Sequence, residues 1–222
     1  MHLENLPLVV NGLNGYSKAF LLYRYKNKPV GKIVLPVENG DLHLEQYHDK
    51  ILDSAGLSLW NALLSDYLQL DERPLPHKPL SATIAICTRD RTDDLRRCLD
   101  SIQKLPYDGQ EVLVIDNCPS SDETMKLVET YQGVRYIREN MPGLNFARNR
   151  AILESKNEVV AFTDDDALPD PAWLRVILQN FDNPLVACVT GMTMPVELET
   201  DGQEAFESYN SFGKGFQRKV HS

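Results

Sequence analysis

The stretch EVVAFTDDD, residues 158–166, joins an apolar run to three consecutive carboxylates. Such a run is typical of a buried strand, and the acidic triplet stands where that strand should emerge. Like charges crowded on a fixed backbone are unfavourable unless a cation or protons relieve them. On an extended backbone, side chains two residues apart point the same way, so Asp164 and Asp166 are expected to share Mg²⁺ or Mn²⁺. Taken alone, an acidic turn explains the triplet equally well.

Upstream and downstream of the triplet, apolar runs alternate with helix-like segments. Strands are expected over residues 82–87, 111–115, 134–137, 158–162 and 186–190. Helices are expected to begin near Thr92 or Asp93, near Ser121, near Asn145 and after Asp170-Pro171. Strands that alternate with helices imply the α/β class, with a mostly parallel sheet flanked by helices.

The first 72 residues have a different pattern. Two strands, 19–25 and 30–35, are expected around a turn, followed by a helix over 48–70. We interpret residues 1–72 as a small α/β accessory module for which docking is the expected role. Residues 73–80 are rich in proline and mixed charge and predict a linker, which leaves 81–222 as the main domain.

Composition limits the partners of the chain. The formal net charge of −9 over 222 residues argues against a general binder of nucleic acid or anionic membrane. The four cysteines are scattered without a Cys-x-x-Cys pair, which favours free thiols in a reducing compartment. No apolar run approaches the roughly 20 residues that span a bilayer. We therefore expect a cytoplasmic protein, with peripheral membrane association left open.

Polar residues follow the expected strands of the main domain. Thr88 and Arg89 follow the first, Asp116 the second, Arg148 lies in the helix after the third, and the acidic triplet ends the fourth. Each has a plain explanation as a cap, a turn or a solvated residue. Ligands of parallel sheets, however, bind beyond the carboxyl ends of the strands, so these residues are expected to meet in one crevice.

A sugar nucleotide held over a metal ion fits this set of groups. Asp116 can accept hydrogen bonds from a base edge or a ribose, and Arg89 can meet polar or anionic parts of the donor. A cation at Asp164 and Asp166 would neutralise a leaving diphosphate. Neither Gly-x-x-x-x-Gly-Lys-Ser/Thr nor a Gly-x-Gly-x-x-Gly after a strand occurs, which disfavours a P-loop enzyme and a Rossmann dehydrogenase.

Four motifs, taken in order, resemble one family. They are ICTRDR (86–91), VIDN (114–117), GLNFARN (143–149) and FTDDD (162–166). As a set they resemble the nucleotide-sugar-binding half of family-two glycosyltransferases, which have the GT-A fold, and they cover about half of the chain.

The resemblance implies a role for each matching residue. Thr88, Arg89 and Asp116 would line the nucleoside pocket, and Arg148 would shape the pyrophosphate side. Within the Asp-x-Asp motif, residues 164–166, Asp164 would lie near the ribose or the metal. Asp165 would belong to the donor-binding set and Asp166 would be the main metal ligand.

The implied reaction is metal-dependent sugar transfer with inversion, from a nucleotide-diphosphate sugar, with a UDP-sugar favoured, to an unknown glycan, lipid or protein. It needs a general base on the acceptor hydroxyl, which in the family follows the Asp-x-Asp in the acceptor half. The chain stops at Ser222, where the family continues into acceptor-binding elements. The carboxylates available there, Glu197, Glu199, Glu204 and Glu207, form no recognisable base motif, so a truncated transferase with an unidentified base is expected.

Two alternatives remain open. The first is a sugar-nucleotide-binding module without efficient turnover, because the base and the acceptor wall are absent. The second is a nucleotidyltransferase, which predicts a glycine-rich triphosphate loop after the first strand. Residues 88–91 contain no glycine, so the second alternative ranks low.

Overall fold

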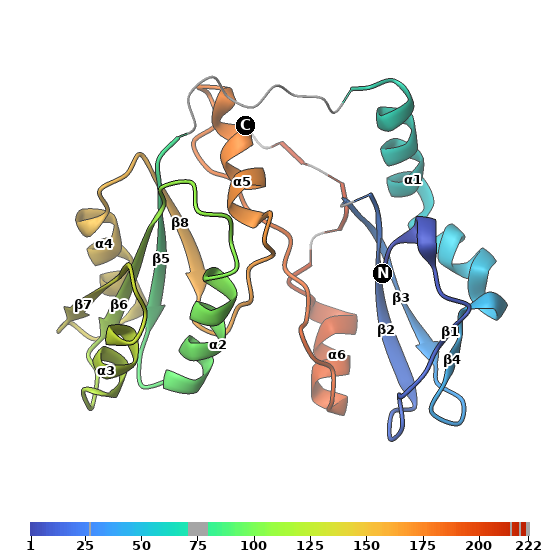
Figure 1. Cartoon of the computed structure of the whole chain (residues 1–222), viewed down its shortest axis with the longest axis horizontal. Helices are drawn as coiled ribbons and strands as arrows, with labels where there is room; N and C mark the ends of the chain where they lie inside the picture. Colours follow the sequence, from blue (N-terminus) through green and yellow to red (C-terminus); the bar gives the residue numbers. More distant parts are fainter. Residues whose placement is uncertain (27, 71–79, 214, 218, 221–222) are drawn as a thin grey trace. The chain divides into compact units, whose positions relative to one another are not determined.

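The computed structural model describes residues 1–26, 28–70, 80–213, 215–217 and 219–220. The chain forms two compact units, one of Met1–Arg73 with Met192–Ser222 and the other of Pro74–Gly191 (Figure 1). The structure therefore groups the last thirty or so residues with the N-terminal module, whereas the sequence pattern placed them in the main domain. Apart from Leu80, the expected linker lies outside the described residues.

The second unit is built on a parallel sheet. Its strands are β5 (Ala82–Thr88), β6 (Glu111–Asn117), β7 (Val134–Glu139) and β8 (Val159–Asp164). They lie in the order β7-β6-β5-β8, and all neighbouring pairs are parallel. The central strands β5 and β6 are buried along most of their length, as continuous apolar runs require. The expected α/β class, with helices flanking a parallel sheet, is confirmed.

Helices cover both faces of this sheet (Figure 1). They are α2 (Thr92–Ile102), α3 (Glu123–Glu129), α4 (Leu144–Glu154) and α5 (Trp173–Leu178), followed by the short η3 (Gln179–Asp182). Alternate residues of a strand point to opposite faces. Ile84 of β5 accordingly packs in one core cluster with Leu99 of α2, while Ala85 packs in another with Leu113 of β6 and Ala147 of α4.

Leu113 supplies a test of this packing. It is fully buried, so Leu113→Ala is expected to lower the free energy of unfolding by about 2–5 kcal/mol through lost burial and the cavity left behind. Leu153 on α4 is 81% exposed, and Leu153→Ala is expected to change stability by less than about 0.5 kcal/mol. Urea unfolding of both variants gives the comparison, and equal losses would show that the α4 face is not packed as described.

Residues 186–190 do not form the expected strand. No residue of this segment pairs with a neighbouring strand, and β8 remains an edge of the sheet. All five residues of the segment are half-buried or exposed. An apolar run becomes a strand only when a partner satisfies its backbone groups, and the described residues supply none here. The prediction was wrong for that reason.

The first unit is a small antiparallel module. Strands β2 (Lys18–Tyr25) and β3 (Lys28–Pro36) form a hairpin against which α1 (His48–Tyr67) packs. Two short strands, β1 (Val9–Val10) and β4 (Leu42–His43), pair beside it, and η1 (Leu3–Asn5) and η2 (Leu44–Tyr47) complete the module. The helix ends before residue 70 and is broken at Gly56, whose φ of 44° is not helical.

Helix α6 (Asp201–Asn210) belongs to the first unit. Thr200 caps it in a capping box with Gln203. Lys18 of β2 pairs with Glu204 at 2.6 Å, and Lys32 of β3 pairs with Glu207. Both glutamates that sequence analysis considered as candidate bases on this helix are thus engaged with lysines.

All four cysteines are free thiols. Among the helices of the described residues, none combines the length and the apolar character needed to cross a bilayer.

Candidate functional site

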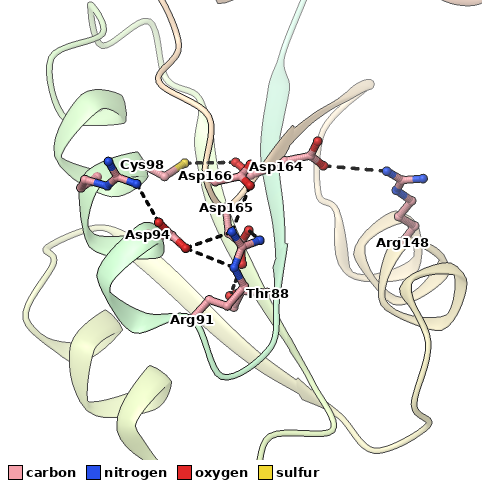
Figure 2. A network of polar contacts seen from close by, with 9 residues as sticks. Thr88, Arg91, Asp94, Cys98, Arg148, Asp164, Asp165 and Asp166 are labelled. Carbon is pink, nitrogen blue, oxygen red and sulfur yellow. Dashed lines mark hydrogen bonds and ion pairs between the residues drawn. The ribbon is translucent and has the colours of Figure 1, made fainter. Parts of the chain in front are cut away.

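The carboxyl ends of all four strands of the sheet lie at the same edge in the second unit. Thr88 of β5 is directly opposite Asp116 of β6, and Cys87 of β5 is opposite Asp164 of β8. Asp116 is in turn opposite Arg138 of β7. These strand ends lie at one edge of the sheet, as parallel strands require, and the crevice expected there stays a prediction. Figure 2 shows the polar network at the end of β8.

Asp165 is held by two donors at the start of the turn after β8. Its Oδ2 accepts a hydrogen bond from Thr88 Oγ1 at 2.7 Å, and its Oδ1 from Arg91 Nη1 at 2.8 Å. Both Asp165 and Thr88 are buried. Burial raises the pKa of the Asp165 carboxyl, and the hydrogen bond from Thr88 and the positive charge of Arg91 oppose that rise. The structure thus gives both residues a positioning role, and their donor-binding role stays a prediction.

The Thr88–Asp165 hydrogen bond can be tested with an isosteric change. Thr88→Val removes the hydroxyl and leaves a buried carboxylate oxygen without its donor, which is expected to cost about 1–3 kcal/mol of unfolding free energy. Thr88→Ser keeps the hydroxyl and should retain most of that stability. Urea titrations compare the two, and a Val variant as stable as the Ser variant would contradict the assignment.

Asp164 and Asp166 do not lie on an extended backbone. Strand β8 ends at Asp164, and the chain then turns, with Ala167 N donating to Asp164 O at 3.2 Å. The turn directs the two carboxylates to different neighbours (Figure 2): Asp164 lies 3.9 Å from Arg148, and Asp166 accepts from Arg91 Nη2 at 3.0 Å. The expectation that they point the same way was wrong, because it assumed that the strand continues through the triplet.

Both carboxylates are open to a ligand. The Asp164 side chain is 75% exposed and that of Asp166 is 51% exposed. No cluster of three or more metal-binding side chains occurs in the part of the chain that the structure describes. Mg²⁺ is commonly held by one or two carboxylates together with substrate phosphates, so either exposed aspartate can contribute to a cation site whose remaining ligands come from a diphosphate. Sharing one cation requires that the two side chains turn away from Arg148 and Arg91.

Asp116 is a buried carboxylate at the end of β6. Its Oδ2 accepts a hydrogen bond from the Tyr136 hydroxyl at 2.8 Å, while its Oδ1 is buried without a hydrogen bond among the described residues. Burial raises the pKa of this carboxyl, and the Tyr136 bond opposes the rise. An unpaired buried acceptor is costly, so this oxygen is a candidate for a ligand that donates.

Side chains that sequence analysis did not assign to the site fix its loops. Asn117 donates to Met141 O at 2.7 Å and accepts from Gly143 N at 2.8 Å, which ties the end of β6 to the loop before α4. Asp90, at a φ of 53°, accepts from both N and Oγ of Ser120 at 2.9 Å. Asn117 stands in the VIDN motif, which was the only signal for it.

The arginines at this edge differ in their contacts. Arg89 and Arg148 are about half exposed, and each forms a long ion pair, Arg89 with Asp90 at 3.8 Å and Arg148 with Asp164 at 3.9 Å. Arg91 instead bridges three carboxylates: Asp94, Asp165 and Asp166. Arg91 belongs to the ICTRDR motif, but its position in the sequence does not indicate that it contacts the turn after β8, so sequence analysis assigned it no role.

Comparison with known proteins assigns the family. Residues 83–220 match the profile of Glycosyl transferase family 2, which is more than half of the chain. The chain therefore belongs to this family, as the motifs implied.

Individual relatives are distant and longer. Glycosyltransferase AglE of Haloferax volcanii is 28% identical over 140 residues, covering 59% of this chain and 44% of its own length. The pre-mycofactocin glycosyltransferase of Mycobacterium tuberculosis is 27% identical over 144 residues, covering 63% of this chain and 29% of its own length. The chain thus spans less than half the length of these curated relatives.

Among solved structures, the mannosyltransferase PcManGT of Pyrobaculum calidifontis, in complex with GDP-Man and Mn²⁺, is 27% identical. It has a TM-score of 0.47 and covers 60% of this chain and 43% of its own.

Proposed function

We propose that this chain carries the donor-binding part of an inverting glycosyltransferase that uses a nucleotide-diphosphate sugar. The observation that carries the proposal is the alignment of Thr88, Asp116 and Asp164 at neighbouring strand ends, in a chain that belongs to Glycosyl transferase family 2. Ligands of parallel sheets bind at this edge.

Asp116 is the proposed partner of the nucleoside. Its unpaired Oδ1 would accept a hydrogen bond from a base N–H or a ribose hydroxyl. This oxygen is buried, so binding requires that it be uncovered. The ligand offsets this cost by supplying the missing donor. Asn117, through its bonds to the loop before α4, holds the neighbouring backbone in place.

The diphosphate is proposed to lie between the start of α4 and the end of β8. Arg148 stands in the second turn of α4, whose N-terminus carries a partial positive charge. Arg89 adds a further exposed cation. Asp164 and Asp166 are the proposed ligands of Mg²⁺ or Mn²⁺, which when bound would neutralise the charge that develops on the leaving diphosphate.

A binding module without efficient turnover is the second candidate. It is favoured by the contacts of Glu204 and Glu207 with Lys18 and Lys32, which already occupy both carboxylates. If it applies, the donor is bound and the sugar is not released.

A donor-hydrolysis assay separates the two candidates. UDP-, GDP- and dTDP-sugars are incubated with the chain and Mn²⁺, and released nucleotide diphosphate is measured against Asp166→Asn as background. A transferase is expected to transfer the sugar of one of the donors slowly to water, and so to release the nucleotide diphosphate. Binding without release supports the module, and the absence of both would overturn the proposal.

A further inference from the structure

Arg91 lies at the centre of the polar network after β5 and β8 (Figure 2). Its Nη1 donates to Asp165 Oδ1 at 2.8 Å, and its Nη2 to Asp166 Oδ2 at 3.0 Å. The same guanidinium contacts Asp94, with Nε at 3.1 Å and Nη2 at 2.9 Å from Oδ2. One guanidinium thus serves three carboxylates from two separate segments of the chain.

The three carboxylates hold Arg91 unequally. Asp165 is 6% exposed at its side chain and has Thr88 as a second donor, so it is fixed in place. Asp94 lies in the first turn of α2 and receives two contacts from Arg91. Asp166 is 51% exposed, and a single guanidinium nitrogen contacts it. Asp166 is therefore the partner that Arg91 can release while it stays anchored on the other two.

Asp166 is also the carboxylate to which the proposed function assigns the cation. A carboxylate that already binds a divalent cation gains little further electrostatic stabilisation from a guanidinium. The guanidinium and the cation also repel each other at short range. Arg91 and the cation therefore compete for Asp166. The competition is weakest when a diphosphate adds negative charge to the site.

We propose that Arg91 forms an ion pair with Asp166 when no nucleotide is bound, and that this ion pair breaks when the nucleotide-bound cation binds Asp166. This inference rests on the proposed function of the site. Arg91 is thereby a positioning residue: it keeps the acidic triplet neutralised and in place, and it keeps the affinity for free cation low until the nucleotide is present.

The test is titration of Mn²⁺ into the nucleotide-free full chain, with free Mn²⁺ followed by electron paramagnetic resonance. Arg91→Ala removes the competitor and a positive charge, so Mn²⁺ affinity is expected to rise about tenfold. Arg97→Ala is the matched control, because Arg97 also contacts Asp94, at 2.7 Å, and forms no ion pair with the triplet among the described residues. It should leave Mn²⁺ affinity within about twofold. A purely structural role for Arg91 predicts unchanged or weaker binding in Arg91→Ala.

Further variants keep the test decisive. The double variant Arg91→Ala/Asp166→Asn is expected to lose the increase in Mn²⁺ affinity, because the carboxylate that pairs with Arg91 is then absent. If Arg91→Ala fails to fold, Arg91→Lys replaces it in the test. The lysine ammonium lacks the planar fork of the guanidinium and pairs less well with Asp166, so Mn²⁺ affinity should still rise about threefold. Equal affinity in wild type and the folded Arg91 variant would overturn the inference. Failure of the wild type to bind Mn²⁺ even with UDP, GDP or dTDP would instead overturn the metal role in the proposed function.

Discussion

Asp166→Asn is expected to abolish the Mn²⁺-dependent part of nucleotide-diphosphate binding. The change removes one of the two exposed carboxylates available to a cation at this edge of the sheet. Loss of a residue that hydrogen-bonds to a metal ligand lowers metal affinity about 10–100-fold, so loss of a direct ligand should lower it about a hundredfold or more. Stability should fall by no more than about 1 kcal/mol, since the pair with Arg91 is half exposed. Calorimetry with and without Mn²⁺ measures the effect.

Glu129→Gln is the control for this result. It removes the same charge from the carboxyl end of α3, which precedes β7 and so lies toward the opposite edge of the sheet. Nucleotide binding should be unchanged in this variant. Equal losses in the two variants would indicate that overall charge, and not a ligand at Asp166, governs the affinity.

Asp116→Asn is expected to weaken nucleotide binding about ten- to a hundredfold while leaving the fold at least as stable as wild type. A hydrogen bond to a charged group is worth about 1.5–3 kcal/mol, and the amide replaces the charge with a weaker acceptor. The wild-type carboxylate is buried with one oxygen unpaired, so it lowers stability at neutral pH. Calorimetry and urea unfolding report the two effects separately, and a variant that both binds normally and unfolds early would contradict the role of Asp116.

The pH dependence of the wild type follows from the same group. Burial raises the pKa of Asp116 in the folded chain. Protonation therefore favours the folded state: this contribution to stability is complete below the pKa of an unfolded aspartate and is lost as pH rises through the folded value. Nucleotide affinity should change in the opposite sense, falling as pH drops through the raised pKa. Asp116→Asn should remove this titration from both curves, and a pH profile of affinity that the substitution leaves unaltered would refute the assignment.

The sheet of the second unit was predictable from sequence because its strands are apolar runs with a helix between each pair. Ile84, Leu113 and their neighbours are buried on both faces, and such runs are recognisable without knowledge of their partners. The convergence of Asp116 and Asp164 then followed from the rule that parallel strands end at one edge. Residues 186–190 have a similar pattern and form no strand, because pairing depends on a neighbour that sequence does not reveal.

The details of the site depend on contacts between distant segments. Arg91 and Asp165 are 74 residues apart, and their pairing requires the turn that begins after Asp164. Sequence analysis treated the triplet as extended and so aligned Asp164 with Asp166. Asn117 and Asp90 hold their loops through contacts that likewise form only once the chain has folded. Asn117 accepts from Gly143 N, and Asp90, in a left-handed conformation, accepts from Ser120. Sequence thus predicted that Thr88, Asp116 and Asp164 stand at neighbouring strand ends, and the structure adds the contacts that hold this edge of the sheet.

The central claim is that this edge of the sheet binds a nucleotide diphosphate together with a divalent cation. Isothermal titration of the full chain with UDP, GDP and dTDP, each with Mn²⁺ and with a chelator, tests it most directly. We predict that at least one nucleotide binds with Mn²⁺ and that its affinity falls at least about tenfold when the cation is removed. Absence of binding by all three nucleotides in the presence of Mn²⁺ would contradict the account.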